Sequence, residues 1–143
     1  MTETTKFESR EALISCTAGE FYSFMTDFRN MRQFLPEGNI TGSDIGKESA
    51  SFRIDPLGDV KIWLTERDPL NKITCSGIAL GSNPFSLLFR IDSAGNNRTS
   101  VIVTLNAEMN SFLKMVAAGP ISKFLEVLVE EMEKFTGWNR PYQ

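Results

Sequence analysis

The sequence predicts an α+β fold in which a curved antiparallel sheet of about six or seven strands wraps around one long C-terminal helix. From residue 38 to residue 110, apolar residues recur with a period of two, which is typical of strands with one buried face. Two short helical segments precede these strands, and a strongly amphipathic segment follows them. The apolar stripe of the last helix must be buried, and the apolar side of the sheet is the available partner.

Length and composition are those of an ordinary globular protein. The chain has 143 residues, and we expect a single domain over 1–143. Its net charge is −3 and it has no block of basic residues, so nucleic-acid binding is not expected. The start, MTETTKFESRE, lacks the apolar segment of a signal peptide, and no apolar run approaches a membrane span, so we expect a cytoplasmic location. Cys16 and Cys75 lie in strand-like sequence and are expected to be buried thiols rather than a disulfide.

A pair of helices is predicted near the N-terminus. The first helix has a capping-box pattern, with Thr17 as the N-cap and Glu20 three residues later. We expect Asp27 to end this helix and to start a second short one, which Pro36 closes. Asp27 and Asn30 should then cap and brace the pair. The apolar residues of the pair recur at helical spacing, namely Phe21, Phe24, Met25 and Phe28.

Turn signals divide the β region into strands that each have one apolar face. A strand with mixed alternation is also predicted before the helices, at 6–15. KITCSGIAL (72–80) is nearly continuous in apolar residues, which is consistent with a strand covered on both faces. The turn signals are DPLGD (55–59), RDPLNK (67–72), GSNP (81–84) and SAGNN (93–97). The apolar faces comprise Ala50, Phe52 and Ile54; Val60, Ile62 and Leu64; Phe85, Leu87, Phe89 and Ile91; and Val101, Val103, Leu105, Ala107 and Met109.

Gly119 and Pro120 interrupt the last amphipathic segment. Proline suits the first turn of a helix, and the residue before a proline is disfavoured in helical geometry. We therefore predict a short helix or loop, SFLKMVAA (111–118), and a separate helix of about sixteen residues that starts at Pro120. The joint reverses the chain, and a further hypothesis is that it borders a cavity mouth, with an adjustable lid formed by Phe112, Met115 and Val116.

Three stretches resemble the START-like/SRPBCC superfamily, whose helix-grip fold is shared with birch-pollen-allergen-like proteins. They are the opening strand with a helix pair ending in D-x-x-N…P (7–36), PFSLLFRID (84–92) and the last segment (110–135). The superfamily includes lipid and hormone binders, aromatic polyketide cyclases and chaperone-ATPase activators. The resemblance implies a tunnel-like cavity between the sheet and the last helix that receives apolar or aromatic ligands. A fold alone does not settle the function.

Few residues of this chain suggest catalysis. It has no histidine, which excludes Ser-His-Asp and Cys-His catalysis and imidazole zinc sites, and we expect neither a metal nor a cofactor. Glu66 is the one weak catalytic candidate, because it is in phase with the apolar face of its strand, and burial would raise its pKa. The alternative is a solvated carboxylate where that strand frays.

Three further residues of the β region are not expected to take part in catalysis. Arg53 and Arg67 are expected to be surface charges. Trp63 is out of phase with its neighbours, and it either packs under a neighbouring element or lies at an interface.

The content of 11 Phe and 6 Met is compatible with an adaptable apolar cavity. The alternative is that these residues fill the core at normal density and leave no room for a ligand. The predicted lining comprises Phe52, Ile62, Leu64, Phe85, Leu87, Phe89, Leu105, Met109, Phe112, Met115, Ile121, Phe124 and Leu128.

Three functions remain open at this point. The first is binding of a small hydrophobic molecule in the cavity, which we favour because no catalytic set is evident. The second is an enzyme of the polyketide cyclase/dehydratase kind that uses Glu66. The third is an interaction protein, either a chaperone activator or a homodimer, and exposed apolar residues on the outer sheet face would favour it: Trp63, Ile78, Leu80 or Leu88.

Overall fold

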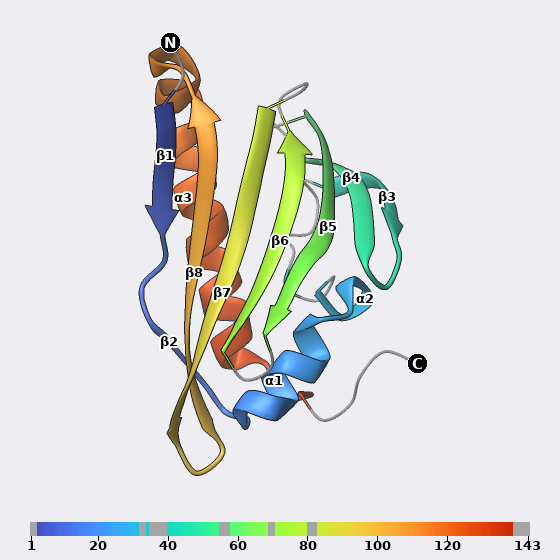
Figure 1. Ribbon diagram of the computed structural model, residues 1–143, viewed down its shortest axis with the longest axis vertical. Coiled ribbons are helices and arrows are strands. Elements are labelled where there is room, and N and C mark those ends of the chain that lie inside the picture. The colour runs from blue at the N-terminus through green and yellow to red at the C-terminus, as the bar shows by residue number, and fades with distance from the viewer. Residues whose placement is uncertain are drawn as a thin grey trace.

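An antiparallel sheet curves around one long helix in the computed structural model, which describes residues 3–31, 34, 40–54, 58–68, 71–79 and 83–138 (Figure 1). The described strands form one eight-stranded sheet with the order β1-β8-β7-β6-β5-β4-β3, and β2 also pairs with β8. The strands are β1 (Glu3–Glu8), β2 (Ala12–Ile14), β3 (Ile40–Ile45), β4 (Ser49–Ile54), β5 (Gly58–Asp68), β6 (Lys72–Ala79), β7 (Asn83–Gly95) and β8 (Arg98–Met109). The helices are α1 (Ala18–Met25), α2 (Phe28–Met31) and α3 (Ser111–Lys134). The predicted α+β helix-grip architecture is confirmed.

The predicted opening strand is two strands, β1 and β2, which both pair with β8. Ser9 lies between them and replaces the regular ladder with local bonds. Its backbone N–H donates to the Val103 carbonyl (2.8 Å), and its Oγ accepts from the Val103 N–H (2.9 Å). The meander from β3 to β8 and these two strands therefore share one sheet.

The concave face of the sheet has the predicted alternation of buried side chains. On β8, Val101, Val103, Leu105, Ala107 and Met109 are all buried. β6 also alternates, which corrects the expectation that both of its faces are covered: Ile73 and Cys75 are fully buried, whereas Ile78 on the other face is 38% exposed. Among the described residues Ile78 is left partly exposed on the outer face of β6, so a nearly continuous apolar run does not by itself indicate burial on both faces.

The helix pair is capped as predicted. The Thr17 Oγ1 accepts from the Glu20 N–H (3.1 Å), and the Glu20 carboxylate accepts from the Thr17 N–H (2.9 Å), so the capping box is complete. The Asp27 carboxylate accepts from the side chain and backbone of Arg29, and the side-chain hydrogen bond is the main cause that lowers the pKa of Asp27. Asn30 is buried and donates to the Phe24 carbonyl (2.9 Å). Pro36, the expected end of the second helix, lies outside the described residues.

An aromatic cluster closes one end of the space between sheet and helix. It contains side chains from α1, from the segment after α2 and from the end of α3, with ring centroids 5.0–6.1 Å apart. Its members are Phe24, Phe34, Phe135 and Trp138. Phe21 joins the cluster to the sheet, because its ring lies 5.3 Å from Trp138 and 6.4 Å from Phe89. Such pairs add to the stability from burial, and they make this end a packed core.

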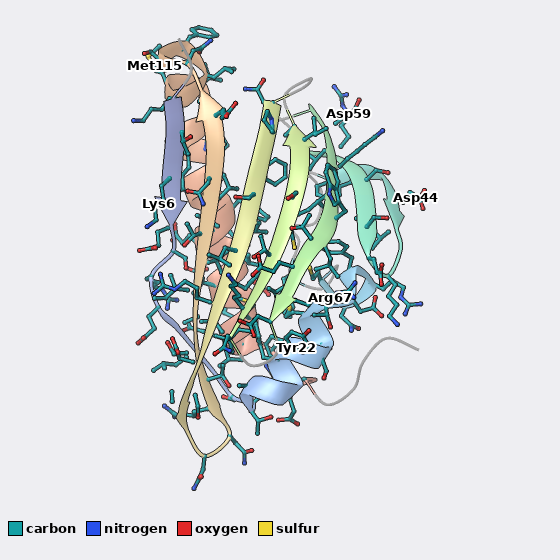
Figure 2. The ribbon with its side chains drawn as sticks, viewed as in Figure 1. Lys6, Tyr22, Asp44, Asp59, Arg67 and Met115 are labelled. Atoms are coloured by element: carbon teal, nitrogen blue, oxygen red, sulfur yellow. The ribbon has the colours of Figure 1, made fainter. Side chains whose placement is uncertain are left out.

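The prediction of two elements around Gly119-Pro120 is wrong. One helix of 24 residues, α3, runs from Ser111 to Lys134 with Pro120 inside it. The helix begins early because the Asn110 side chain caps it, accepting from the Leu113 N–H at 2.8 Å. Ala117 and Ile121 lie one turn apart on either side of the proline and are both buried, so packing holds the helix continuous there. Its first turns reach one extremity of the molecule, where Met115 lies (Figure 2).

A charged clamp joins the other half of α3 to the segment between β1 and β2. The Arg10 guanidinium donates two hydrogen bonds to the Glu133 carboxylate, at 2.6 and 3.0 Å, and the Leu13 N–H donates a third at 3.1 Å. The hydrogen bond from Arg10 is the main cause that lowers the pKa of Glu133. The clamp therefore fixes the position of α3 across the edge of the sheet.

The two cysteines are free and buried, as predicted. Burial raises the pKa of the Cys75 thiol to about 12. Burial is also the largest cause that raises the pKa of the Cys16 thiol to about 12. Neither thiol is therefore ionised near neutral pH. Within the described part of the chain, no helix combines the length and the hydropathy that crossing a membrane requires.

Replacing Pro120 by alanine should stabilise the protein. The ring removes one hydrogen bond from the helix interior, so Pro120→Ala should raise the free energy of unfolding by about 1–3 kcal/mol. Gly119 is helical and exposed, with space for a Cβ, so Gly119→Ala should add about 0.5–1 kcal/mol. Urea unfolding of both variants and of the wild type measures these changes in the free energy of unfolding. A less stable Pro120→Ala variant would instead support a helix that starts at the proline.

Replacing Glu133 by glutamine should lower the melting temperature at neutral pH by a few degrees. The folded-state pKa of Glu133 is lowered, so its stabilising effect is present above its ordinary value of 4.5 and is lost as the pH falls through the lowered pKa. The difference in melting temperature between the wild type and Glu133→Gln should therefore become smaller below about pH 4.5. Glu131→Gln removes the same charge from the same helix and is the control. A difference that does not depend on pH would refute the role of this charge.

Candidate functional site

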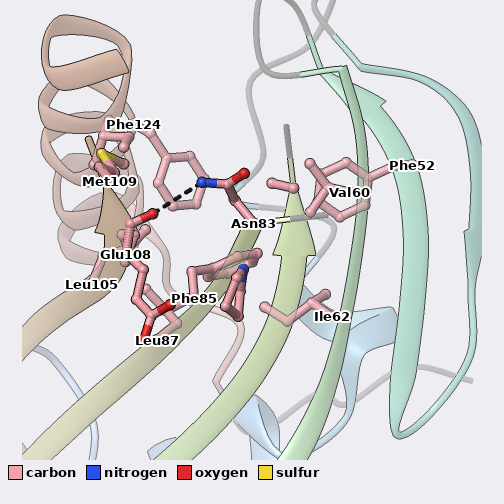
Figure 3. A pocket seen from close by; sticks show the side chains of 14 residues that line it. Phe52, Val60, Ile62, Asn83, Phe85, Leu87, Leu105, Glu108, Met109 and Phe124 are labelled. Carbon is pink, nitrogen blue, oxygen red and sulfur yellow. Dashed lines mark hydrogen bonds between the residues drawn. The ribbon is translucent and has the colours of Figure 1, made fainter. Parts of the chain in front are cut away.

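A cavity of about 90 Å³ lies between the sheet and α3 (Figure 3). Its lining contains none of the residues of the aromatic cluster. The cavity lies at the end of the sheet where β5 and β7 begin and β6 and β8 finish. Four strands and one helix therefore contribute most of its wall. The lining residues are Phe52, Val60, Ile62, Ala79, Asn83, Pro84, Phe85, Leu87, Leu105, Ala107, Glu108, Met109, Ile121 and Phe124.

The lining is apolar except at its rim. Asn83 and Glu108 are the polar residues among those that line the cavity. The Asn83 side-chain N–H donates to the Glu108 backbone carbonyl (3.0 Å), which ties the start of β7 to the end of β8 (Figure 3). The Glu108 side chain is exposed, on the polar side of its strand. The cavity can thus hold an apolar group through contact and shape, with polar groups available only at the mouth.

Gly77 determines how closely the Phe85 ring, which lines the cavity, packs on β6. It lies on the concave face of β6, paired with Phe85 on one side and Ile62 on the other. A Cβ at Gly77 would lie 2.4 Å from Cζ of Phe85 and 2.6 Å from the Lys61 carbonyl oxygen. The Phe85 ring therefore packs directly on the backbone of β6, where any other residue would push it away. A glycine inside a strand is a sequence signal for such close approach, so Gly77 is the residue that could have indicated this contact.

The core is divided next to this point. Val60 and Ala79 form a small buried cluster with Phe52 and Phe85, separate from the main core around α3. Phe52 and Phe85 are only partly buried, and they also contact the main core. The cavity lies beside these two rings, next to the small cluster and the main core.

Most of the predicted lining residues come together at the cavity. Those that line it are Phe52, Ile62, Phe85, Leu87, Leu105, Met109, Ile121 and Phe124. Leu64, Phe89 and Leu128 belong to the main core instead, where sheet and helix pack without a gap. The placement of Phe112 and Met115 in the cavity is wrong: they are 66% and 75% exposed. Because α3 is continuous, both side chains lie on the side of the helix that faces away from the buried Ala117.

Glu66 does not reach the cavity, which removes the weak catalytic candidate. A register shift between Leu64 and Glu66 interrupts the pairing of β5 with β6, so that Glu66 pairs with Thr74 rather than following the phase of Leu64. Its side chain is 52% exposed and makes an ion pair with Lys72 at 2.7 Å. A bulge of this kind inverts the alternation beyond it, and simple counting along β5 could not reveal it.

The other charged and aromatic candidates lie on the surface. Arg53 pairs with Asp59 (3.4 Å) and Arg67 with Glu48 (2.9 Å), both as exposed charges. Trp63 is 37% exposed on the outer face of the sheet, the same face as the exposed Ile78, and Leu88 is half-buried. Leu80 lies outside the described residues. Among the described residues that line the cavity, Glu108 is the one titratable residue, and its side chain is exposed at the rim. In the described ranges, no group of three or more acidic or cysteine residues is arranged to hold a metal ion.

Comparison by sequence finds nothing: no family model and no curated protein matches this chain. Comparison by structure finds several similar proteins. Norcoclaurine synthase from Thalictrum flavum, solved with dopamine and hydroxybenzaldehyde, is 13% identical, with a TM-score of 0.67 over 90% of this chain and 86% of that one. The Zhui aromatase/cyclase from Streptomyces sp. R1128 is 14% identical, with a TM-score of 0.66 over 92% and 95%. DR_A0006 from Deinococcus radiodurans is 16% identical, with a TM-score of 0.59 over 91% and 95%.

The TM-scores, over at least 86% of each chain, show that these proteins and this chain share one fold. At such low identity the likeness concerns the fold and not the activity. The fold that the resemblance implies is thereby confirmed: the chain has the helix-grip fold.

Proposed function

We propose that this protein binds a small apolar or aromatic molecule in the cavity between the sheet and α3. The observation that carries the proposal is the apolar wall built by five strands, β4 to β8, and one helix, with polar groups only at the rim. The norcoclaurine synthase structure, which contains dopamine and hydroxybenzaldehyde, supports it by showing that the same fold accommodates aromatic molecules. We further propose that residues 1–143 form a single domain that acts in the cytoplasm.

The size of the cavity limits the ligand. Ligand pockets usually measure roughly 300–1,000 Å³, whereas this cavity has about 90 Å³. A small ring or a short alkyl chain fits, and a larger molecule enters only if the partly buried rings at the wall turn aside. Those rings are Phe52, Phe85 and Phe124. Affinity then comes from apolar contact, and specificity comes from shape.

Catalysis by Glu66 forms no part of this proposal, because that carboxylate is exposed and paired with Lys72. A second candidate function is self-association through the outer face of the sheet, which the exposed Trp63 and Ile78 favour. The two functions are compatible, since they use opposite faces of the sheet.

Filling the cavity should abolish ligand binding. Ala107→Leu adds about three methylene-sized groups at the wall, and Ala107 is 7% exposed and faces Phe85 across the β7–β8 pair. Toluene and n-hexanol are suitable probes, with methyl NMR shifts of Leu105, Met109 and Ile121 as the readout. We expect saturable shifts in the wild type and none in Ala107→Leu, whose melting temperature should not fall.

Ala94→Leu is the matched control, because Ala94 is exposed on the β7–β8 hairpin, and it should bind both probes like the wild type. The proposal fails if the wild type shows no shifts at saturating probe. It also fails if Ala107→Leu binds as well as Ala94→Leu does.

Self-association makes a separate prediction. If the outer face joins two copies, light scattering should report a dimer whose dissociation constant rises about tenfold or more in Trp63→Ser, because a large apolar side chain leaves the interface. Arg98→Ser, at the exposed β7–β8 hairpin, should leave the dimer unchanged. A monomeric wild type at high protein concentration would exclude this second function.

A further inference from the structure

The first turns of α3 carry an apolar surface that the core does not use. Phe112, Met115 and Val116 are 66%, 75% and 49% exposed. With the exposed Gly119 they lie on one side of the helix, at spacings of three and four residues. Single exposed apolar residues are normal, but three large ones within about a turn form a contact surface. We define residues 111–123 as the α3 tip.

The charge of the α3 tip differs from that of the rest of the protein. From Met109 to Leu125 the sequence contains no acidic residue, and its charged residues are Lys114 and Lys123. Both lysines are exposed. The second half of the helix is acidic, with Glu126, Glu130, Glu131 and Glu133, and the whole chain has a net charge of −3. The α3 tip is therefore both apolar and cationic, although the protein as a whole is acidic. Such a surface is complementary to an apolar layer whose boundary is anionic.

From this combination we propose that the α3 tip docks on anionic lipid bilayers, with Phe112, Met115 and Val116 in the outer acyl region and the lysines at the headgroups. Apolar residues beside basic ones on one part of a helix are the pattern of interfacial membrane binding. Lysine contributes about 1 kcal/mol near such a surface. The tip lies at an extremity of the molecule, as the position of Met115 shows (Figure 2), so a flat layer can reach it.

The position of the tip relates it to the cavity. α3 begins two residues after Met109, which lines the cavity, and Ile121 and Phe124 of the same helix also line it. A docked tip therefore brings the mouth of the cavity towards the bilayer, where poorly water-soluble molecules accumulate. The docking itself does not rest on the proposed ligand, because vesicle binding is measured without any ligand.

The test is vesicle flotation of the full chain with phosphatidylcholine alone and with phosphatidylcholine containing about one third phosphatidylserine. We expect binding to the anionic vesicles that weakens with added salt, and much weaker binding to the neutral ones. Phe112→Ser/Met115→Ser should lower the partition coefficient about tenfold or more. Lys114→Glu/Lys123→Glu should lower it at least about tenfold on anionic vesicles and little on neutral ones.

Ile78→Ser is the matched control, since Ile78 is an exposed apolar residue on the sheet rather than on the tip. It should leave the partition coefficient unchanged, and every variant should keep the wild-type melting temperature because the changed residues are exposed. The proposal is overturned if the wild type does not float with anionic vesicles, or if Ile78→Ser reduces binding as much as the tip variant. It is also overturned if the tip residues instead control the molar mass in light scattering, which would make the occupant a second copy of the chain.

Discussion

The contact between the apolar stripe of α3 and the concave face of the sheet is the interaction on which the rest of the structure depends. Leu125, Leu128, Val129 and Met132 are at most 3% exposed, so this half of the helix is embedded in the main core. Burial of one such side chain contributes about 1.5–3 kcal/mol. The aromatic cluster around Trp138 continues the same packing beyond the end of the helix. Together these contacts fix the C-terminal half of the helix firmly.

The opposite end of α3 is therefore where function can reside. There fewer residues of α3 are buried, the wall contains the small residues Ala79 and Ala107, and the space between helix and sheet is not filled. The same helix passes from a packed acidic half, clamped by Arg10, to an exposed apolar and cationic beginning. A single element thus closes the core, forms one wall of the cavity and presents a surface outside it.

Local rules of the sequence predicted most of this fold. The capping box at Thr17, the period-two strands and the stripe of α3 depend on nearby residues, and all three are confirmed. The errors arose where distant contacts decide. Packing of Ala117 and Ile121 carries the helix through Pro120, and a bulge in β5 turns Glu66 outwards. The cavity depends on the register that sets Phe85 over Gly77, which the sequence alone does not specify.

The central claim is that an apolar space persists between β7, β8 and α3 in the folded protein. The most direct measurement is a crystal structure under xenon pressure, because xenon enters dry apolar cavities and needs no chemical recognition. The account predicts a xenon atom in contact with Phe85, Leu105 and Phe124, and an otherwise unchanged core. Xenon found only elsewhere, with the rings of Phe52 and Phe85 packed against Phe124, would contradict it.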